Sequence, residues 1–520
     1  MSELNTDILI YGGTSSAIIA AVQAKRLGKS VIIVCPETRL GGLSSGGLGF
    51  TDSGNTSAIG GLSLEFYQRL YSYYGDESNW FWEKSTDFCN VGQGTTAIDH
   101  EWKAAWSFEP KAAKQIFENF INDHQITVCR DEWLDRENGV ETADGQIKSI
   151  TMHSGNRYEA QVFIDASYEG DLMAAAGVSY HIGREANSVY NEKWNGVQTG
   201  VLHHKHWFSH DVSPYQENEK LFPYVSSEDP GEYGEGDNKI QAYCFRMCMT
   251  NHSYNRIPFP KPDAYDPEKY ALFLEAWKDR DDFFEKFDMI PNCKTDTNNH
   301  GPFSSDYIGK NWNYPDASHE ERQAIIADHK RYQMGLLYFA QNDPRVPAYI
   351  HEGMQDWGLP RDEYTETDNW SPQLYIREAR RMVGEQVMTE AEVMSEREVT
   401  KSIGMGSYAL DSHNIQRYIT ADGFVQNEGD IGIHAPKAYG ISYDCLVPKK
   451  DEIQNLLVPV CMSSSHIAFG SIRMEPVFMV LGHSAATAAS LAIDNNQAVQ
   501  DVDYDILREL LLKDGQVLSL

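Results

Sequence analysis

A glycine-containing turn near the N-terminus is the first part of this chain whose residue types and spacing point to chemistry. It consists of Gly12-Gly13-Thr14-Ser15-Ser16-Ala17. Set against the dinucleotide-binding pattern G-x-G-x-x-G/A, Gly12 takes the first place and Ala17 the third. Thr14 takes the middle place, where glycine normally lets the backbone approach a pyrophosphate, and Gly13 can supply that freedom one residue earlier. An ordinary strand–helix turn is the competing interpretation of so short a motif.

A second stretch strengthens the nucleotide-binding interpretation. The position expected to accept ribose hydroxyls is Cys35, so Glu37 becomes the candidate acceptor. The next residues are Arg39-Leu40-Gly41-Gly42 and, after two more, Ser45-Gly46-Gly47-Leu48-Gly49. Five glycines in nine residues allow close contact between the backbone and a flat or anionic ligand. A flexible surface loop is the alternative, but the interleaved leucines favour burial.

The elements that must position these turns follow from the apolar pattern. Residues 7–11 and 31–34 indicate buried strands, and residues 14–27 between them indicate a helix that ends at Gly28. Strand, helix and strand within so short a stretch predict a parallel βαβ unit with a right-handed crossover. Further elements are expected as helices at 62–74, 110–122 and 476–493, and as strands at 161–166 and 456–461.

The apolar pattern also predicts how the chain is divided. It fades near residue 181, where aromatic residues, Pro, Asn and His become frequent, and it returns near residue 440. We therefore expect an α/β nucleotide-binding domain built from both chain ends, residues 1–180 and 440–520. A large, loop-rich α+β substrate or cap domain, residues 181–439, is inserted between them.

Composition limits the classes of partner. Asp and Glu number 76 against 44 Lys and Arg, a formal net charge of −32. Such a charge disfavours nucleic acid and anionic membranes as partners. The N-terminus lacks the basic and apolar regions of a signal peptide, and no apolar run approaches the roughly 18 residues that span a bilayer. We expect a cytoplasmic protein with no nucleic-acid or membrane partner.

Longer blocks then carry a family resemblance over almost the whole chain. They are IYGGT (10–14), LGGLSSGGL (40–48), FIDASYEGDL (163–172), GRE (183–185), KTDTNNHG (294–301), YIREARR (375–381), DSHN (411–414), SSHIA (464–468) and RMEP (473–476). In these blocks the chain resembles the FAD-dependent oxidoreductases that are often labelled xanthan lyase-like. The resemblance implies a glutathione-reductase-like, Rossmann-type FAD domain, bound FAD and redox chemistry.

The turns and the matched blocks together give a set of expected FAD-binding residues. Arg377 and Arg381 join it as one face of a predicted helix at i, i+4, and Gly482 as part of a small-residue face on the C-terminal helix. A surface ion pair within that predicted helix is the competing role for Arg380. The full set is Gly12, Gly13, Thr14, Ser15, Ser16, Glu37, Arg39, Gly41, Gly42, Ser45, Gly46, Gly47, Ala166, Glu169, Gly170, Asp171, Arg377, Arg381 and Gly482.

Oxidation of a hydroxyl group needs a base, and three histidines in polar blocks are the candidates. His466 comes first because three serines precede it and Arg473 and the C-terminal helix follow it. His413 and His300 are next. Arg473 is expected to stabilise developing negative charge. For His466 the alternatives are a structural histidine bonded to the backbone and a hydrogen-bond donor that contacts the flavin.

A histidine tract at 203–206, followed by His210, resembles a metal-binding sequence. No carboxylate accompanies it in the sequence and no fixed ligand spacing follows it, so we expect no metal site.

The leading functional hypothesis is an FAD-dependent dehydrogenase or oxidase of a hydroxyl-bearing small molecule, and the resemblance favours a sugar or glycoside. Reduction of an activated alkene, with Arg473 and Arg377 clamping carboxylates, is the second hypothesis. A non-redox lyase or binding protein that retains the fold is the third. The electron acceptor and the oligomeric state stay open at this stage.

Overall fold

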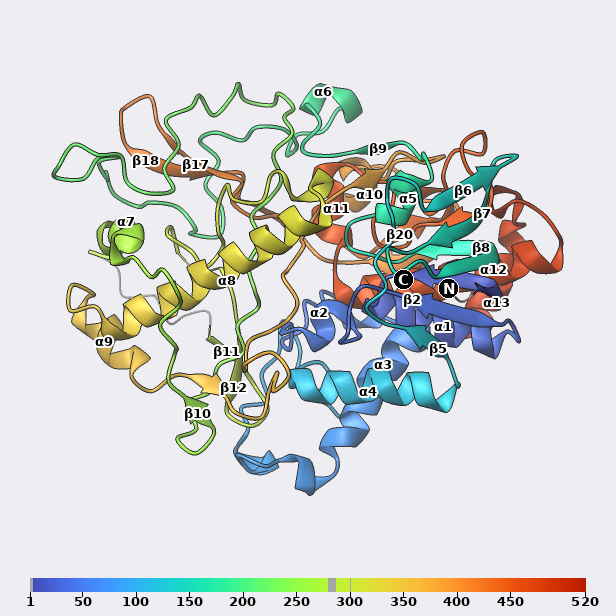
Figure 1. The fold of residues 1–520 in the computed structure, drawn as a ribbon, viewed down its shortest axis with the longest axis horizontal. Coiled ribbons are helices and arrows are strands. Elements are labelled where there is room, and N and C mark those ends of the chain that lie inside the picture. Colours follow the sequence, from blue (N-terminus) through green and yellow to red (C-terminus); the bar gives the residue numbers. More distant parts are fainter. Residues whose placement is uncertain (1–2, 279–286, 300) are drawn as a thin grey trace.

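The computed structural model describes residues 3–278, 287–299 and 301–520. A seven-stranded sheet has the order β5-β2-β1-β8-β7-β6, and β21 pairs with β8 outside that path. Figure 1 shows this sheet close to both chain ends. Its strands are β1 (Glu3–Tyr11), β2 (Val31–Val34), β5 (Thr127–Cys129), β6 (Val140–Ala143), β7 (Gln146–Thr151), β8 (Arg157–Asp165) and β21 (Leu456–Leu457).

A βαβ unit forms the centre of the sheet, as the sequence predicts. β1 runs parallel to β2, with Ile8 opposite Val31, and parallel to β8, with Ile8 opposite Val162. The helix α1 (Ser15–Arg26) connects β1 to β2 and is buried along most of its length. Because β1, β2 and β8 are parallel, their carboxyl ends meet at one edge, which is where open α/β sheets bind ligands.

The C-terminal part of the chain joins the same layer. β21 pairs in parallel with β8, Leu456 lying opposite Phe163, and is shorter than the strand expected at 456–461. The long helix α12 (Glu475–Asp494) lies against α1, and Figure 1 shows these red and blue segments side by side. A Cβ on Gly482 would overlap the Ser16 carbonyl oxygen, so glycine permits this close packing.

Two more of the expected helices lie on the same side of the molecule, α3 (Gly61–Tyr74) and α4 (Pro110–Asp123). Among the described residues, α12 alone is long and apolar enough to cross a membrane, and 89% of its most apolar window is buried inside the protein. Its apolar character is therefore that of a core helix.

The remaining chain forms short hairpins and long loops around one long helix, α8 (His319–Asn342), which crosses the middle of Figure 1. A capping box between Ser318 and Glu321 begins α8. The other helices are α2 (Gly42–Ser45), α5 (Asp171–Ala175), α6 (Asn187–Tyr190), α7 (Ala271–Ala276), α9 (Ala348–Met354), α10 (Glu390–Val393), α11 (His466–Ile472) and α13 (Tyr504–Lys513). The paired short strands are β3 (Ile98–Asp99) with β4 (Ala104–Ala105), β9 (Tyr180–His181) with β14 (Arg381–Met382), β10 (Arg256–Ile257) with β13 (Leu359–Pro360), β11 (Phe287–Ile290) with β12 (Lys294–Thr297), β15 (Ser402–Gly406) with β20 (Tyr439–Ser442), β16 (Leu410–Ser412) with β19 (Ile431–Ile433), and β17 (Gln416–Ile419) with β18 (Val425–Glu428).

Candidate functional site

The turn between β1 and α1 is held tightly against the end of β8. Gly12 has φ +111°, and a Cβ there would lie 2.8 Å from the Ala166 carbonyl carbon and from the Ser167 nitrogen. Thr14 donates its hydroxyl hydrogen to the Ala166 carbonyl oxygen at 2.7 Å and caps α1 by accepting from the Ala17 N–H. The threonine that departs from the glycine pattern therefore ties the turn to β8 and begins the helix.

The second glycine stretch lies beside this turn. The Gly41 N–H donates to the Gly13 carbonyl oxygen at 2.8 Å. Gly42, with φ +51°, contacts the Tyr168 hydroxyl, which also accepts from the Leu43 N–H at 2.9 Å. The backbones of both predicted loops thus meet at the carboxyl edge of the sheet.

Arg39 and three neighbouring residues of this stretch hold the loop in shape. Arg39 donates to the carbonyl oxygens of Ser45 and Pro110 and pairs with Glu366 at 2.7 Å, which occupies its guanidinium group. The Ser45 hydroxyl donates to the Leu40 carbonyl oxygen at 2.6 Å. The space beside Gly46 and Gly47 is filled by Gln373 and by the Arg246 backbone.

A cavity of about 280 Å³ opens along this edge. Glu37, at the end of β2, lines it and accepts from the Gly13 N–H at 3.0 Å. Burial and the nearby Glu169 raise the pKa of Glu37 to about 7. The hydroxyl of Ser16, in the first turn of α1, is buried with no partner among the described residues. Other residues lining the cavity include Tyr11, Arg39, Gly42, Ser45, Trp133, Ser167, Glu169 and Asp171.

These features fit FAD. The N-terminus of α1 follows Tyr11, which lines the cavity, and a helix N-terminus suits a phosphate. Gly42 in the lining leaves room for a ligand, and Glu37 can accept ribose hydroxyls. Glu37, Arg39, Gly42 and Ser45 therefore line one cavity, and the predicted turn adjoins it through the hydrogen bond from Gly13 to Glu37.

The segment after β8, residues 169–171, contains two acids that interact with arginine and tyrosine side chains. Gly170 has φ +67° and precedes α5, whose first residue is Asp171. Asp171 accepts hydrogen bonds from Arg322 at 2.6 and 2.9 Å and pairs with Arg380 at 2.8 Å. Burial opposes the charge of Asp171, but these arginines hold the pKa of its carboxyl well below the ordinary value. The neighbouring Glu169 accepts from Tyr314 at 3.0 Å, and burial raises its pKa.

The helix expected at 377–381 does not form. The segment is extended, and Arg381 opens the short strand β14. Arg377 pairs with Asp306 at 2.9 Å, whereas Arg381 pairs with Glu185 at 2.7 Å. The two arginines do not share a helix face, because each extends to a carboxylate far away in the sequence. The surface ion pair within a helix expected for Arg380 is also wrong, since its partners are Asp171 and Asp316.

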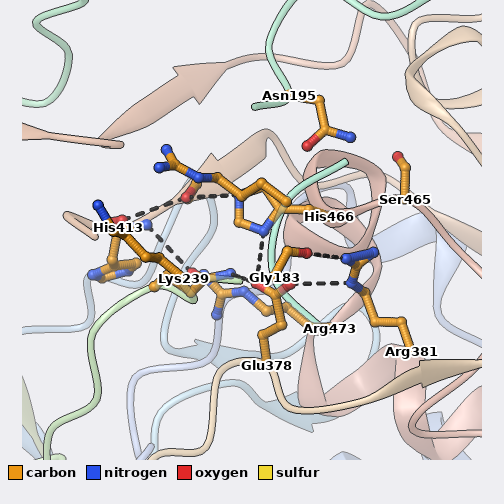
Figure 2. Close-up of polar contacts among 12 residues, drawn as sticks. Gly183, Asn195, Lys239, Glu378, Arg381, His413, Ser465, His466 and Arg473 are labelled. Carbon is orange, nitrogen blue, oxygen red and sulfur yellow. Dashed lines mark hydrogen bonds and ion pairs between the residues drawn. The ribbon is translucent and has the colours of Figure 1, made fainter. Parts of the chain in front are cut away.

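His466 forms a buried pair with Glu378. Its Nδ1 lies 2.7 Å from Glu378 Oε2, and its Nε2 lies 3.3 Å from the Ser412 hydroxyl. Glu378 also accepts from Arg381 Nε at 3.0 Å and from the Gln241 amide at 3.0 Å. Burial opposes the charged form of Glu378, but His466 and Arg381 lower its pKa to about 2. Figure 2 shows His466, Glu378 and Arg381 side by side.

His413 forms a second pair of the same kind. Its Nδ1 lies 2.8 Å from Asp306 Oδ2, and its Nε2 lies 3.7 Å from Asp411. Burial and the Arg377 charge lower the pKa of His413 to about 4, although the two carboxylates oppose this. His413 is therefore neutral at pH 7.

Arg473 connects these groups. It donates to the Tyr375 hydroxyl at 2.6 Å and pairs with Asp411 at 2.9 Å, while its Nε is buried with no partner in the described ranges. Gln241 lies between the two histidine pairs: its amide oxygen accepts from Arg473 and from the His413 N–H, and its amide nitrogen donates to Glu378. The result is one polar network that contains three of the predicted catalytic residues.

The N-terminus of α12 meets the N-terminus of α1. Glu475, the first residue of α12, accepts from the hydroxyls of Ser15 at 2.6 Å, Ser44 at 3.0 Å and Tyr168 at 2.5 Å. Burial raises the pKa of Glu475, and these hydrogen bonds oppose the shift. Gly482 lies two turns further along, where it packs on α1.

One predicted residue, His300, lies outside the described residues. Several residues of the network were missed from the sequence. Glu378, Asp411 and Glu475 lie inside the blocks that carry the family resemblance. Each acid is close in sequence to a candidate histidine or arginine, and this proximity could have marked it as a site residue. Gln241 and Asp306 lie in no such block, and nothing local marks them.

Comparisons with known proteins identify a family for the chain. A family model described as FAD dependent oxidoreductase matches residues 7–511. No curated protein matches the chain. The structure is similar in part to L-proline dehydrogenase from P. horikoshii, at 14% identity, over 36% of this chain and 59% of that one, with a TM-score of 0.25. It is also similar to L-amino acid deaminase from Proteus vulgaris, at 15% identity, over 36% and 54%, with a TM-score of 0.23. Both matches span less than two thirds of the other protein and carry no information about a substrate.

Proposed function

The chain belongs to the FAD-dependent oxidoreductase family, and we propose that it oxidises a hydroxyl-bearing small molecule with His466 as the base. One observation carries this proposal. Glu378 holds Nδ1 of His466 at 2.7 Å, so Nε2 is the nitrogen left to accept a proton. The same carboxylate faces the positive charge that the imidazole gains when it takes up that proton.

The chain's own residues would hold the cofactor at the cavity described above. The N-terminus of α1 suits its phosphates, Glu37 suits a ribose, and the loop at 39–47 suits its ring system. Bound FAD supplies the acceptor for a hydride from the substrate carbon. The protein must then orient the substrate and remove the hydroxyl proton, and the network around Gln241 is built for both tasks.

Arg473 has a supporting role. Tyr375 and Asp411 occupy its terminal nitrogens, while Nε is left without a partner among the described residues. A buried N–H of this kind can donate to the substrate oxygen. Asp411 neutralises most of the arginine charge, which suits an uncharged alcohol better than an anionic substrate.

A sugar or glycoside is the substrate class that we favour. A cleft of about 1040 Å³ is lined in part by His181 and Lys239, and Figure 2 shows Lys239 beside the network. The side chains of Tyr180 and Trp312 also line it. Aromatic rings beside polar groups suit a molecule that has apolar faces and many hydroxyls.

The alkene-reductase hypothesis has less support. It requires Arg473 and Arg377 to clamp substrate carboxylates, yet Asp411 and Asp306 already pair with them. The lyase or binding-protein hypothesis does not explain why a protein of an FAD-dependent family holds two buried histidines, each against a carboxylate.

Replacement of His466 tests the proposal. His466→Ala and His466→Gln should retain FAD and lower the rate of anaerobic flavin reduction by at least about a hundredfold, with partial recovery at high pH. The readout is the loss of visible flavin absorbance on mixing with a panel of sugars, glycosides and simple alcohols. His100→Ala is the control, because His100 lies at the surface, where it bonds Tyr71. The proposal would be contradicted if the flavin of both His466 variants were reduced at the parent rate. It would also be contradicted if no hydroxyl compound reduced the parent flavin while enoates reoxidised the reduced enzyme.

A further inference from the structure

The histidine tract at 203–206 does have a carboxylate partner, supplied from far along the chain. Asp430 lies in the turn between β18 and β19. Its Oδ1 is 2.9 Å from His204 Nδ1 and 3.8 Å from His206 Nδ1. The ligand atoms of the three residues all lie within 4.8 Å of one another. The fold therefore supplies the carboxylate that the neighbouring sequence does not.

The surroundings hold these side chains in place. The ring of His204 lies over Gly432, where a Cβ would overlap His204 Nε2, so only glycine leaves room for the ring. The Gly432 N–H donates to Nδ1 of the adjacent His203 at 3.0 Å. His204 and Lys205 both have a positive φ, +50° and +61°, a backbone conformation that non-glycine residues seldom adopt and that clusters at functional sites.

His206 is fixed through its backbone. Its carbonyl oxygen accepts from the amides of Asn414 at 3.1 Å and Asn427 at 2.8 Å. Its Nδ1 lies 3.2 Å from the Asn299 amide nitrogen, a hydrogen bond that a metal ion at Nδ1 would replace.

Asp430 provides the observation that points to a ligand. The residue is only 5% exposed, and its second oxygen, Oδ2, is buried with no hydrogen-bond partner among the residues described. A carboxylate oxygen that is removed from water without a donor is costly to leave unsatisfied. A cation bound by this carboxylate would remove that cost.

We propose that His204, His206 and Asp430 bind one divalent transition-metal ion of the zinc class. Two neutral imidazoles and one carboxylate are the ligand types that such ions prefer, and sites with three protein ligands keep a position open for water or substrate. The His204 side chain is 37% exposed, so an ion can reach the site from solvent.

The site adjoins the network of the proposed function but does not depend on it. The His206 carbonyl oxygen accepts from Asn414, the residue next to His413 of the network. Metal binding can therefore be tested without any assumption about the substrate or the base.

Titration of the FAD-loaded protein with ZnCl₂ by calorimetry tests the proposal, after tag removal and treatment with a chelator. The parent should bind one equivalent, and His206→Ala and Asp430→Asn should each weaken binding at least tenfold. His210→Ala is the matched control, because His210 follows the same tract but bonds the Glu275 carbonyl oxygen. Flavin absorbance verifies that each variant is folded.

Co²⁺ is the second probe, since its absorption at wavelengths beyond the flavin bands reports coordination by nitrogen. These bands should form in the parent and in His210→Ala, and be absent in the two ligand variants. The proposal is overturned if the parent binds neither ion, or if the ligand variants bind both as the parent does.

Discussion

Substitution of Gly12 by alanine tests how the first turn serves the cofactor. The added methyl group would lie 2.8 Å from the Ala166 carbonyl carbon and from the Ser167 nitrogen, both backbone atoms that cannot rotate away. Ser167 also lines the cavity assigned to FAD. The end of β8 and the start of α1 must therefore move apart, and the site should bind FAD less well.

Two costs add up at this position. A residue with a Cβ at positive φ costs roughly 1–2 kcal/mol. Overpacking against a fixed backbone costs roughly 1–3 kcal/mol more, so the free energy of unfolding should fall by roughly 2–5 kcal/mol. Gly28→Ala separates the two costs, because Gly28 has φ +77° in the same βαβ unit and a Cβ there would meet no atom within 4 Å. That variant should lose only about 1–2 kcal/mol.

Urea unfolding of both variants, with the ratio of flavin to protein absorbance in the folded fraction, provides the measurement. We expect Gly28→Ala to keep a full complement of FAD and Gly12→Ala to lose most of it. If the two variants are equally destabilised and equally yellow, the clash with β8 is of no consequence and our account of the turn is wrong.

Three further predictions follow from the buried charges. Glu378→Gln should retain FAD yet slow flavin reduction at least about tenfold, because the proton on His466 loses its counter-charge; a stopped-flow rate within twofold of the parent would refute this. His413 has a pKa of about 4 in the folded protein, below that of a free histidine. Its contribution to the free energy of unfolding is therefore present above pH 6.5 and is lost as the pH falls towards 4. His413→Gln should therefore flatten the acid limb of a pH–stability curve measured by urea unfolding, and an unchanged limb would count against the assignment. Glu37 has a raised pKa of about 7. Its contribution to the free energy of unfolding is therefore present below pH 4.5 and is lost as the pH rises through 7. Glu37→Gln should stabilise the apoprotein at pH 8 relative to the parent and weaken FAD binding, whereas a destabilised apoprotein at that pH would contradict the shift.

Local patterns were sufficient to predict the elements that build the nucleotide-binding layer. The strands at 7–11 and 31–34, the helix between them and the C-terminal helix at 476–493 are all found as β1, β2, α1 and α12. Each is marked by an apolar run of the right length and by glycine or proline at its ends, and these signals act within a few residues.

The segment at 375–381 shows why the rest could not be predicted. Its charges have helical spacing, but Arg377 and Arg381 reach Asp306 and Glu185, which lie far away in the chain. Buried ion pairs of this kind decide the backbone conformation, and a sequence pattern does not reveal which distant carboxylate will be present. The same limit applies to Asp430, which meets the histidine tract only after β18 and β19 have formed.

The packing of α12 on α1 has a consequence for synthesis of the chain on the ribosome. About 450 residues separate the end of α1 from the start of α12. At roughly 5–20 residues per second, the apolar surface of α1 waits about 20–90 s for its partner. During that interval the nascent chain exposes a surface suited to chaperones, and β8 lacks β21 as a neighbour. Glu475 reaches Ser15 and Ser44 only at the end, so translation must be nearly complete before the N-terminus of α1 acquires these hydrogen bonds.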